Sequence, residues 1–233
     1  KSRGKVSMQE VLNQSLNTGM VFVMKSLGRN LFATYMKAYG LGEKTGIDLP
    51  NEIPGLIANL NSPRDVEHAT AAFGQGIALT PIATIRALAS LGNGGFLVQP
   101  YLTDQIDYES GVKDITEPPL SKRILKSETS KTITSMLVKV VDTALIGGKA
   151  KMEHYSIAAK TGTAQISAPG GGYYEDRFTH SLFGYFPASN PRFITMLYMI
   201  HPRRARFASE TLTTPFMNLT KFLLNYYQVP PDR

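Results

Sequence analysis

The sequence predicts an α+β fold, with an antiparallel sheet flanked by helices. Three strand patterns follow one another late in the chain, at residues 156–166, 181–187 and 193–200. Helical patterns precede them and another follows them, so no crossover helix separates the strands. Strands that are joined directly favour antiparallel pairing, with the helices packed on the resulting sheet.

The first helices are predicted by their end signals. Ser7 and Glu10 form a capping box, which starts a helix that should break near residues 15–17. A second apolar-periodic stretch covers residues 21–36 and should end at a Gly-Leu-Gly sequence. Residues 43–70 contain three prolines and little periodicity, which favours an extended loop with short pieces of structure.

The later elements follow from similar signals. Thr80 is a good N-cap and Pro81 a good first helical residue, and residues 96–125 read as short strands, Tyr101-Leu102 among them, with a turn at 109–111. Ser127 should cap a longer helix. A Gly-rich loop carrying Tyr173 and Tyr174 should join the first two late strands. The last helix should begin near Thr214-Pro215 and bury Phe216, Leu219, Phe222, Leu223 and Tyr226.

Composition sets the broad class. The chain has 233 residues, 42% of them hydrophobic, which suits one large domain spanning residues 1–233. Its net charge of +7 suits a solvated surface or contact with anionic lipid or cell-wall polymer, but clustered bases with interleaved aromatics are missing, so nucleic acid is not an expected partner. There is no cysteine, and the four histidines lack metal-ligand spacing, so neither a metal nor a cofactor is expected.

The sequence Lys160-Thr161-Gly162-Thr163 carries the most chemistry. In a strand, Thr161 and Thr163 share one face, and two such hydroxyls can bind a carboxylate. Gly162 allows a ligand to approach the backbone closely, and Lys160 adds a positive charge suited to an anionic substrate. At a sheet edge, the strand could also pair with an extended peptide. The alternative is an ordinary strand with a solvated lysine.

A second polar motif, Ser15-Leu16-Asn17, lies just past the end of the first predicted helix. A serine and an asparagine in that place can share proton transfer and amide binding, although a polar helix end is an equally simple interpretation. The motif lies 145 residues before Lys160, so only the fold can bring the two together.

Together these motifs resemble the transpeptidase domain of class B penicillin-binding proteins, a fold shared with serine β-lactamases. The order is Ser-Leu-Asn, then Phe73-Gly-Gln-Gly-Ile77 with Thr80-Pro81, then Gly92-Asn-Gly-Gly95, then Lys-Thr-Gly-Thr-Ala-Gln. The resemblance covers nearly the whole chain and is closer to division and sporulation members than to elongation members.

The resemblance implies peptidoglycan cross-linking by acyl transfer from a D-Ala-D-Ala stem peptide, at a site that β-lactams acylate. It implies that Ser15 relays a proton, that Asn17 holds the substrate amide, and that Lys160 hydrogen-bonds Ser15. Thr161 and Thr163 would bind the substrate carboxylate, beside Gly162, and the N–H of Thr163 would be one oxyanion-hole donor.

One family motif departs from the pattern. The nucleophile motif Ser-x-x-Lys should lie several dozen residues before Ser15, but only 14 residues precede it. The formal matches Ser2–Lys5 and Ser110–Lys113 lie at the chain end and in a turn, where we expect coincidence. We therefore expect the chain to be the C-terminal two-thirds of the domain and to be inactive alone. The nucleophile, an N-terminal strand and a membrane anchor would lie outside it.

Three hypotheses stay open: a D,D-transpeptidase, a non-catalytic scaffold or β-lactam sensor of the same fold, and a serine β-lactamase. The resemblance implies stem peptides and β-lactams as ligands, cell-wall synthesis partners such as a glycosyltransferase, and a location on the extracytoplasmic face of the bacterial cytoplasmic membrane.

Overall fold

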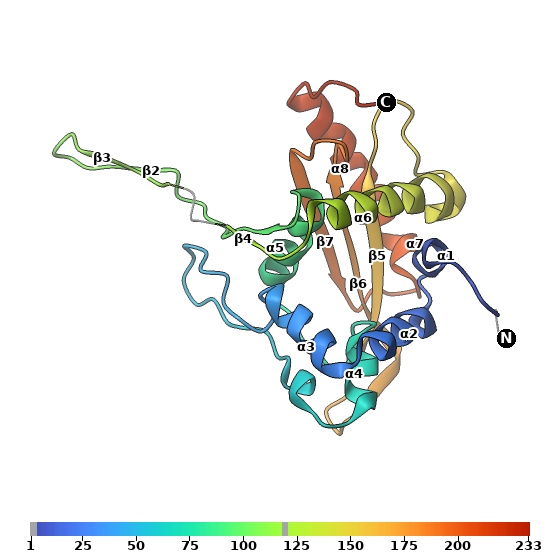
Figure 1. Cartoon of the computed structure of the whole chain (residues 1–233). Helices are drawn as coiled ribbons and strands as arrows, with labels where there is room; N and C mark the ends of the chain where they lie inside the picture. The colour runs from blue at the N-terminus through green and yellow to red at the C-terminus, as the bar shows by residue number, and fades with distance from the viewer. Residues whose placement is uncertain (1–3, 118–120) are drawn as a thin grey trace.

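A three-stranded antiparallel sheet forms the centre of the molecule (Figure 1). The computed structural model describes residues 4–117 and 121–233. The strands are β5 (Ala158–Ser167), β6 (Tyr173–Phe186) and β7 (Phe193–Ile200), in the order β5-β6-β7. The prediction of an α+β fold with an antiparallel sheet and flanking helices is therefore confirmed.

One face of the sheet is covered by α8 (Thr213–Tyr226), which follows the short helix α7 (Ala208–Thr211). Leu182 and Phe186 of β6 share a core cluster with Phe216 of α8. These two residues are four positions apart in the strand, and an even separation places their side chains on the same face of the sheet. The face beneath α8 is therefore made by the even-numbered residues of β6.

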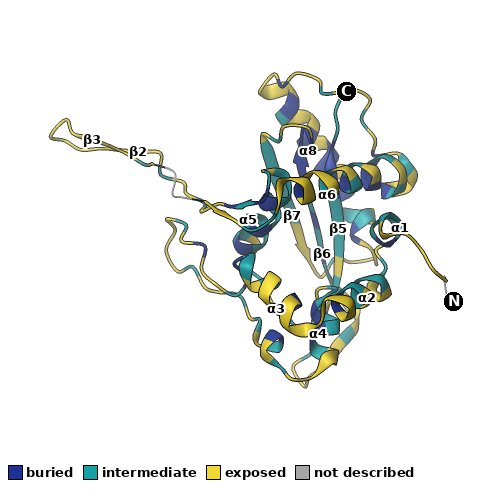
Figure 2. Cartoon of the chain, viewed as in Figure 1, coloured by how far each residue is buried: buried dark blue, intermediate teal, exposed yellow. Residues whose placement is uncertain are grey.

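The other face carries α5 (Pro81–Gly92) and α6 (Ser127–Lys139). Tyr185 of β6 lies in a second cluster with Leu137 of α6 and Ala158 of β5. The Tyr185 hydroxyl is 2.8 Å from the Thr134 hydroxyl. The sheet is thus buried between two helical layers, and Figure 2 shows its dark blue residues where those layers meet.

A separate group of helices lies below the sheet in Figure 1. Its core cluster contains Met24, Phe32, Leu60 and Ala71. The group consists of α2 (Asn17–Leu27), α3 (Arg29–Ala38), the 3-10 helix η1 (Ala58–Asn61) and α4 (Asp65–Ala71). The preceding helix α1 (Met8–Asn13) packs against α6 and α2 at the side of the sheet.

Two helix caps agree with the sequence patterns. The Ser7 hydroxyl accepts the Glu10 N–H at 3.2 Å, and the Thr80 hydroxyl accepts the Ala83 N–H at 3.2 Å. The second half of the predicted capping box is different, because the Glu10 carboxylate accepts hydrogen bonds from Asn13 and Gln14.

Other local predictions were wrong. The stretch over residues 21–36 is broken at Gly28, whose φ of 76° leaves the helical region. Ser127 is the first residue of α6, and Lys126 occupies the N-cap position. Tyr173 and Tyr174 begin β6 rather than ending a loop. By contrast, the prediction of an extended loop with short pieces of structure over residues 43–70 is confirmed, because the helices that begin there are the short η1 and α4.

The last helix also differs from its prediction. Phe216 is buried, but Phe222 and Tyr226 are 59% and 69% exposed and stack on each other at 5.6 Å between ring centroids. The buried face of α8 instead includes Met217 and Leu224. The apolar stripe is wider than the face that the sheet covers, so periodicity alone could not choose the buried half.

Two small ladders lie outside the central sheet. β1 (Phe96–Leu97) pairs with β4 (Lys122–Arg123), and β2 (Gln105–Asp107) pairs with β3 (Lys113–Ile115). The predicted strand at Tyr101-Leu102 is absent from the structure. The β2–β3 hairpin extends far from the sheet (Figure 1). Within the described residues, 4–117 and 121–233, no helix is both long and apolar enough to cross a bilayer.

Candidate active site

A cleft of about 680 Å³ runs along the edge strand β5. Within the described residues, β5 pairs only with β6, so its other edge is open to the cleft. The opposite wall is the turn between α1 and α2. The floor near α6 includes the π-helical turn η2 (Val140–Ala144) and the following 3-10 turn η3 (Leu145–Gly148).

The turn that carries Ser15 has an unusual backbone. Ser15 has a φ of 51°, and its N–H donates to the carbonyl of Leu12 at 3.2 Å. A side chain in this left-handed region costs about 1–2 kcal/mol relative to helix, which the surrounding structure must offset. Gly19 allows α2 to approach α1, because a Cβ there would lie 2.6 Å from the Val11 methyl groups. This packing brings α1 and α2 close together on the two sides of the turn that carries Ser15.

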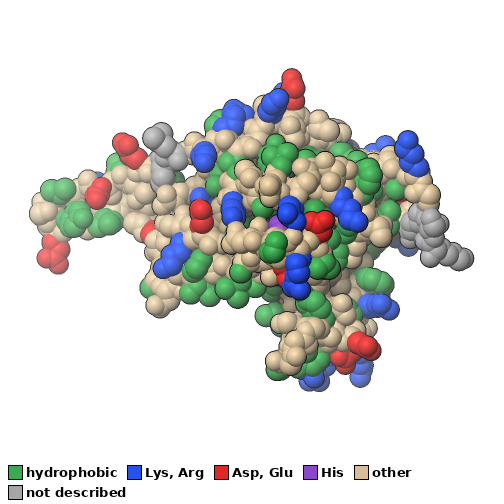
Figure 3. Space-filling model, turned by 60° about the horizontal axis from the view of Figure 1, so that its bottom comes forward, with side chains coloured by type: hydrophobic (Ala, Val, Ile, Leu, Met, Phe, Trp, Pro, Cys, Tyr) green, Lys and Arg blue, Asp and Glu red, His purple; other side chains and the backbone are tan. Residues whose placement is uncertain are grey.

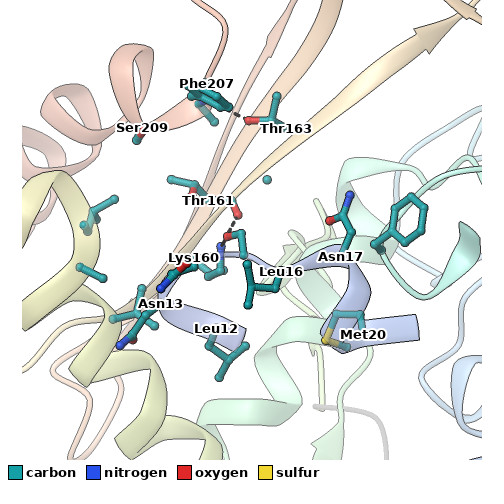
Figure 4. Close-up of a pocket in the computed structure, with 18 of the residues that line it drawn as sticks. Leu12, Asn13, Leu16, Asn17, Met20, Lys160, Thr161, Thr163, Phe207 and Ser209 are labelled. Atoms are coloured by element: carbon teal, nitrogen blue, oxygen red, sulfur yellow. Dashed lines mark hydrogen bonds between the residues drawn. The ribbon is translucent and has the colours of Figure 1, made fainter. Parts of the chain in front are cut away.

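Lys160 crosses the cleft toward that turn. Its Nζ donates to the Ser15 hydroxyl and, at 3.0 Å, to the carbonyl of Thr161 (Figure 4). Burial lowers the pKa of Lys160 from 10.5 to about 8, because few water molecules reach the ammonium group. The two motifs that lie 145 residues apart therefore meet, as the resemblance implied.

The two threonines belong to the other face of β5. Thr161 and Thr163 share parity with Ala159, which lies in the core cluster beneath α8. The Thr163 hydroxyl accepts the N–H of Ala208, the first residue of α7, at 3.0 Å. That bond leaves the hydroxyl proton of Thr163 available to a ligand.

All six residues that the sequence predicted for the site line this cleft. They are Ser15, Asn17, Lys160, Thr161, Gly162 and Thr163. Asn17 is the first residue of α2, so its side chain enters the cleft two residues after Ser15 (Figure 4). The structure thus brings the predicted residues together, while their individual chemical roles stay predictions.

Sequence reasoning missed other lining residues. Phe73 and Gln75 follow α4, and their Phe-Gly-Gln-Gly sequence was a family marker without an assigned place in the site. Glu175 on β6 is the one carboxylate among the lining residues, and Arg206 precedes α7. The charges of Glu175 and Arg206 lie on exposed segments with no local motif, so only the fold could place them here.

The formal nucleophile match Ser110–Lys113 is not among the residues that line the cleft. Ser110 lies in the turn of the β2–β3 hairpin, which projects away from the sheet (Figure 1). Ser2 lies outside the described residues. The expectation that Ser110–Lys113 is a coincidence therefore agrees with its position in the fold.

The described residues offer no cluster of three or more histidine, cysteine or acidic side chains able to hold a metal ion. Two buried histidines are used by the fold itself. The ring nitrogens of His68 lie 3.2 Å from the carbonyls of Arg64 and Leu60, and His180 Nδ1 is 2.8 Å from the Thr211 hydroxyl.

The combination of an open edge strand, a Lys-Thr-Gly-Thr wall and a facing serine is typical of penicillin-binding proteins. Residues 1–219 match the family described as the penicillin binding protein transpeptidase domain, and the chain belongs to this family. The class B resemblance inferred from the motifs is thereby confirmed.

Relatives with curated descriptions have related names. The chain is 35% identical over 210 residues to stage V sporulation protein D of Bacillus subtilis, covering 89% of this chain and 32% of the relative. It is 28% identical to peptidoglycan D,D-transpeptidase FtsI of Escherichia coli, covering 98% of this chain and 37% of the relative. The chain therefore spans about a third of the length of these relatives.

Solved structures share the same fold. Penicillin binding protein 3 from Mycobacterium tuberculosis in complex with ampicillin superposes with a TM-score of 0.89 at 26% identity, covering 97% of this chain and 52% of that chain. The transpeptidase domain of Burkholderia pseudomallei penicillin-binding protein 3, at 22% identity, gives a TM-score of 0.84.

Proposed function

We propose that this chain forms the substrate-binding wall of a D,D-transpeptidase, which cross-links peptidoglycan by acyl transfer from D-Ala-D-Ala stem peptides. The observation that carries the proposal is the hydrogen bond from Lys160 to Ser15 inside the cleft. A relative bears the name peptidoglycan D,D-transpeptidase, and a structural neighbour was solved with ampicillin.

The open edge of β5 explains how a peptide would be held. An extended stem peptide can pair with the strand through backbone hydrogen bonds, as a further strand of the sheet. Its terminal carboxylate would meet the hydroxyls of Thr161 and Thr163. Lys160 adds an ammonium group that stays mostly protonated below pH 8 and attracts that carboxylate.

The reacting carbonyl would lie beside Ser15 and Asn17. In this proposal Asn17 holds the amide of the substrate, and Ser15 relays a proton while Lys160 keeps its hydroxyl oriented. The N–H of Thr163 would serve as one oxyanion-hole donor. Removing one such donor raises the barrier by about 3 kcal/mol in a serine protease.

The attacking serine is proposed to come from a Ser-x-x-Lys segment outside these 233 residues. β-Lactams would acylate that serine, because they present a carboxylate and a strained amide to the same cleft. The second candidate function is a scaffold or sensor without a nucleophile. It is supported because Ser15 and Ser209, the serines among the lining residues, do not belong to a Ser-x-x-Lys motif.

Incubation with a fluorescent penicillin separates the two functions. The full-length protein should become labelled on a serine of a Ser-x-x-Lys motif, mapped by peptide mass spectrometry. The 233-residue chain by itself should stay unlabelled. An unlabelled full-length protein would favour the scaffold, and label on Ser110 would show that the nucleophile had been misplaced.

The proposed substrate also implies a location for the protein. Peptidoglycan lies outside the cytoplasmic membrane, so the domain would act on its extracytoplasmic face, held by an anchor outside these residues. We also propose a peptidoglycan glycosyltransferase as a working partner, because cross-linking consumes the glycan strands that such an enzyme makes.

A further inference from the structure

We propose that the β2–β3 hairpin is a docking arm for another protein, whose binding surface is apolar and flanked by lysine and arginine side chains. The arm comprises residues 101–117. It projects from the body of the molecule, well away from the cleft (Figure 1). Four observations support the proposal: its isolation, its one-sided pattern of side chains, its charge and its anchored base.

The arm is a ribbon of two strands only. β2 and β3 pair with each other, and within the described residues no third strand joins them. A two-stranded hairpin is at best marginally stable in water, and it usually needs a packed face to be stable. The body of this chain does not provide that packing at the far end of the arm (Figure 1).

One face of the ribbon is apolar. Ile106 pairs with Asp114, and the Tyr108 N–H donates to the Val112 carbonyl at 2.9 Å. Side chains alternate along each strand, so Ile106, Tyr108 and Val112 lie on one face with Asp114. The three apolar side chains are 45%, 50% and 59% exposed. We call this set the apolar arm face.

The opposite face is mostly polar. It carries Gln105, Asp107, Lys113 and Ile115, and Asp107 forms an ion pair with Lys113 at 3.7 Å. The two faces thus differ in character, which favours docking by one side of the ribbon. They also provide matched positions for an experiment.

Charge indicates the chemistry of the partner. Residues 101–117 contain five acidic side chains and one basic one, a net charge of −4 in a chain of net charge +7, so the rest of the chain carries +11. In Figure 3 the arm, at the left, shows green and red side chains, whereas most of the charged side chains on the body are blue. Acidic side chains repel anionic lipid headgroups and nucleic acid, so a protein surface with basic side chains is the better match.

The base of the arm is held in place. The Asp48 carboxylate accepts the N–H groups of Leu102 and Thr103, both at 2.7 Å. The side-chain hydrogen bond from Thr103, together with these two N–H groups, lowers the pKa of Asp48 to about 2, so the anchor is ionised at neutral pH. An arm fixed at its base presents its apolar face in a defined direction, which reduces the entropy lost on binding.

Site-specific photo-crosslinking in the cells that make the full-length protein tests this proposal. A benzophenone amino acid replaces Ile106 or Val112 on the apolar arm face, and Gln105 or Lys113 on the other face as matched controls. We expect one adduct with a different protein from the first pair only. The cross-linked site should lie beside lysine or arginine residues when mapped by mass spectrometry.

Charge reversal supplies the second part of the test. Asp114→Lys should lower the adduct yield about tenfold or more, because like charges would face each other in the complex, and Asp114→Asn should lower it less. Equal adducts from both faces, no adduct, a lipid adduct, or an adduct with a second copy of this chain would each overturn the proposal. The cross-linking yield does not depend on penicillin labelling, so the docking proposal can fail while the proposed function holds, and the reverse.

Discussion

The ionisation of Lys160 gives the sharpest quantitative prediction. Burial in the cleft lowers its pKa to about 8, whereas a lysine in a model peptide titrates near 10.4. At pH 7.5 about a quarter of the molecules should therefore carry a neutral Lys160, compared with about 0.1% for an ordinary lysine. The site would lose its attraction for a substrate carboxylate as the pH rises through 8.

Heteronuclear NMR of protein labelled at the lysine Cε carbons measures this pKa directly. One resonance should titrate near pH 8, and it should vanish in the Lys160→Arg variant, which assigns it. Because the unfolded chain binds this proton more tightly, the free energy of unfolding should also rise with pH between about 8 and 10.5. A Lys160 resonance that titrates at 10 or above would refute the desolvated cleft.

Further predictions concern backbone space and the arm anchor. Gly162→Ala should cost under about 1 kcal/mol of stability, because the new Cβ meets only the rotatable Ser181 hydroxyl at 2.6 Å. In the full-length protein the same variant should slow penicillin acylation, because the methyl group crowds the ligand. Gly184→Ala should lower the free energy of unfolding by about 1–3 kcal/mol in a thermal melt, because its Cβ meets the Phe216 ring. An equal loss of stability in the Gly162 and Gly184 variants would contradict this packing. Asp48→Asn should destabilise the protein above pH 4, and progressively less as the pH falls toward 2, the pKa of Asp48 in the folded state. If urea unfolding gave the same stability difference between wild type and variant at every pH, Asp48 would not anchor the arm as an ionised carboxylate.

The central fold could be predicted because its signals are local. The strand patterns and the caps at Ser7 and Thr80 each depend on a few neighbouring residues, and the structure contains them. Antiparallel order followed from the absence of crossover helices. Burial on α8 could not be predicted, because Phe222 and Phe216 have the same character and only the position of the sheet distinguishes them.

For the site too, residues in local motifs could be predicted, and residues placed only by the fold could not. The Lys-Thr-Gly-Thr and Ser-Leu-Asn motifs line one cleft, although they lie 145 residues apart, and their chemical roles stay predictions. Glu175, Phe73 and Arg206 reach the cleft from three separate segments without a local pattern. The left-handed backbone of Ser15 was equally hidden, because nothing in Ser-Leu-Asn requires a φ of 51°.

The central claim is that Lys160 on β5 and Ser15 on the opposite wall, joined by a hydrogen bond across the cleft, belong to the substrate-binding part of an acyl-transfer site. The second-order rate constant for acylation of the full-length protein by a fluorescent penicillin tests it most directly. Lys160→Ala should lower that constant by about tenfold to a hundredfold, as expected for loss of a hydrogen bond to a charged group. The exposed control Lys151→Ala should leave it unchanged. Equal rate constants for wild type and Lys160→Ala, with the fold intact, would contradict the account.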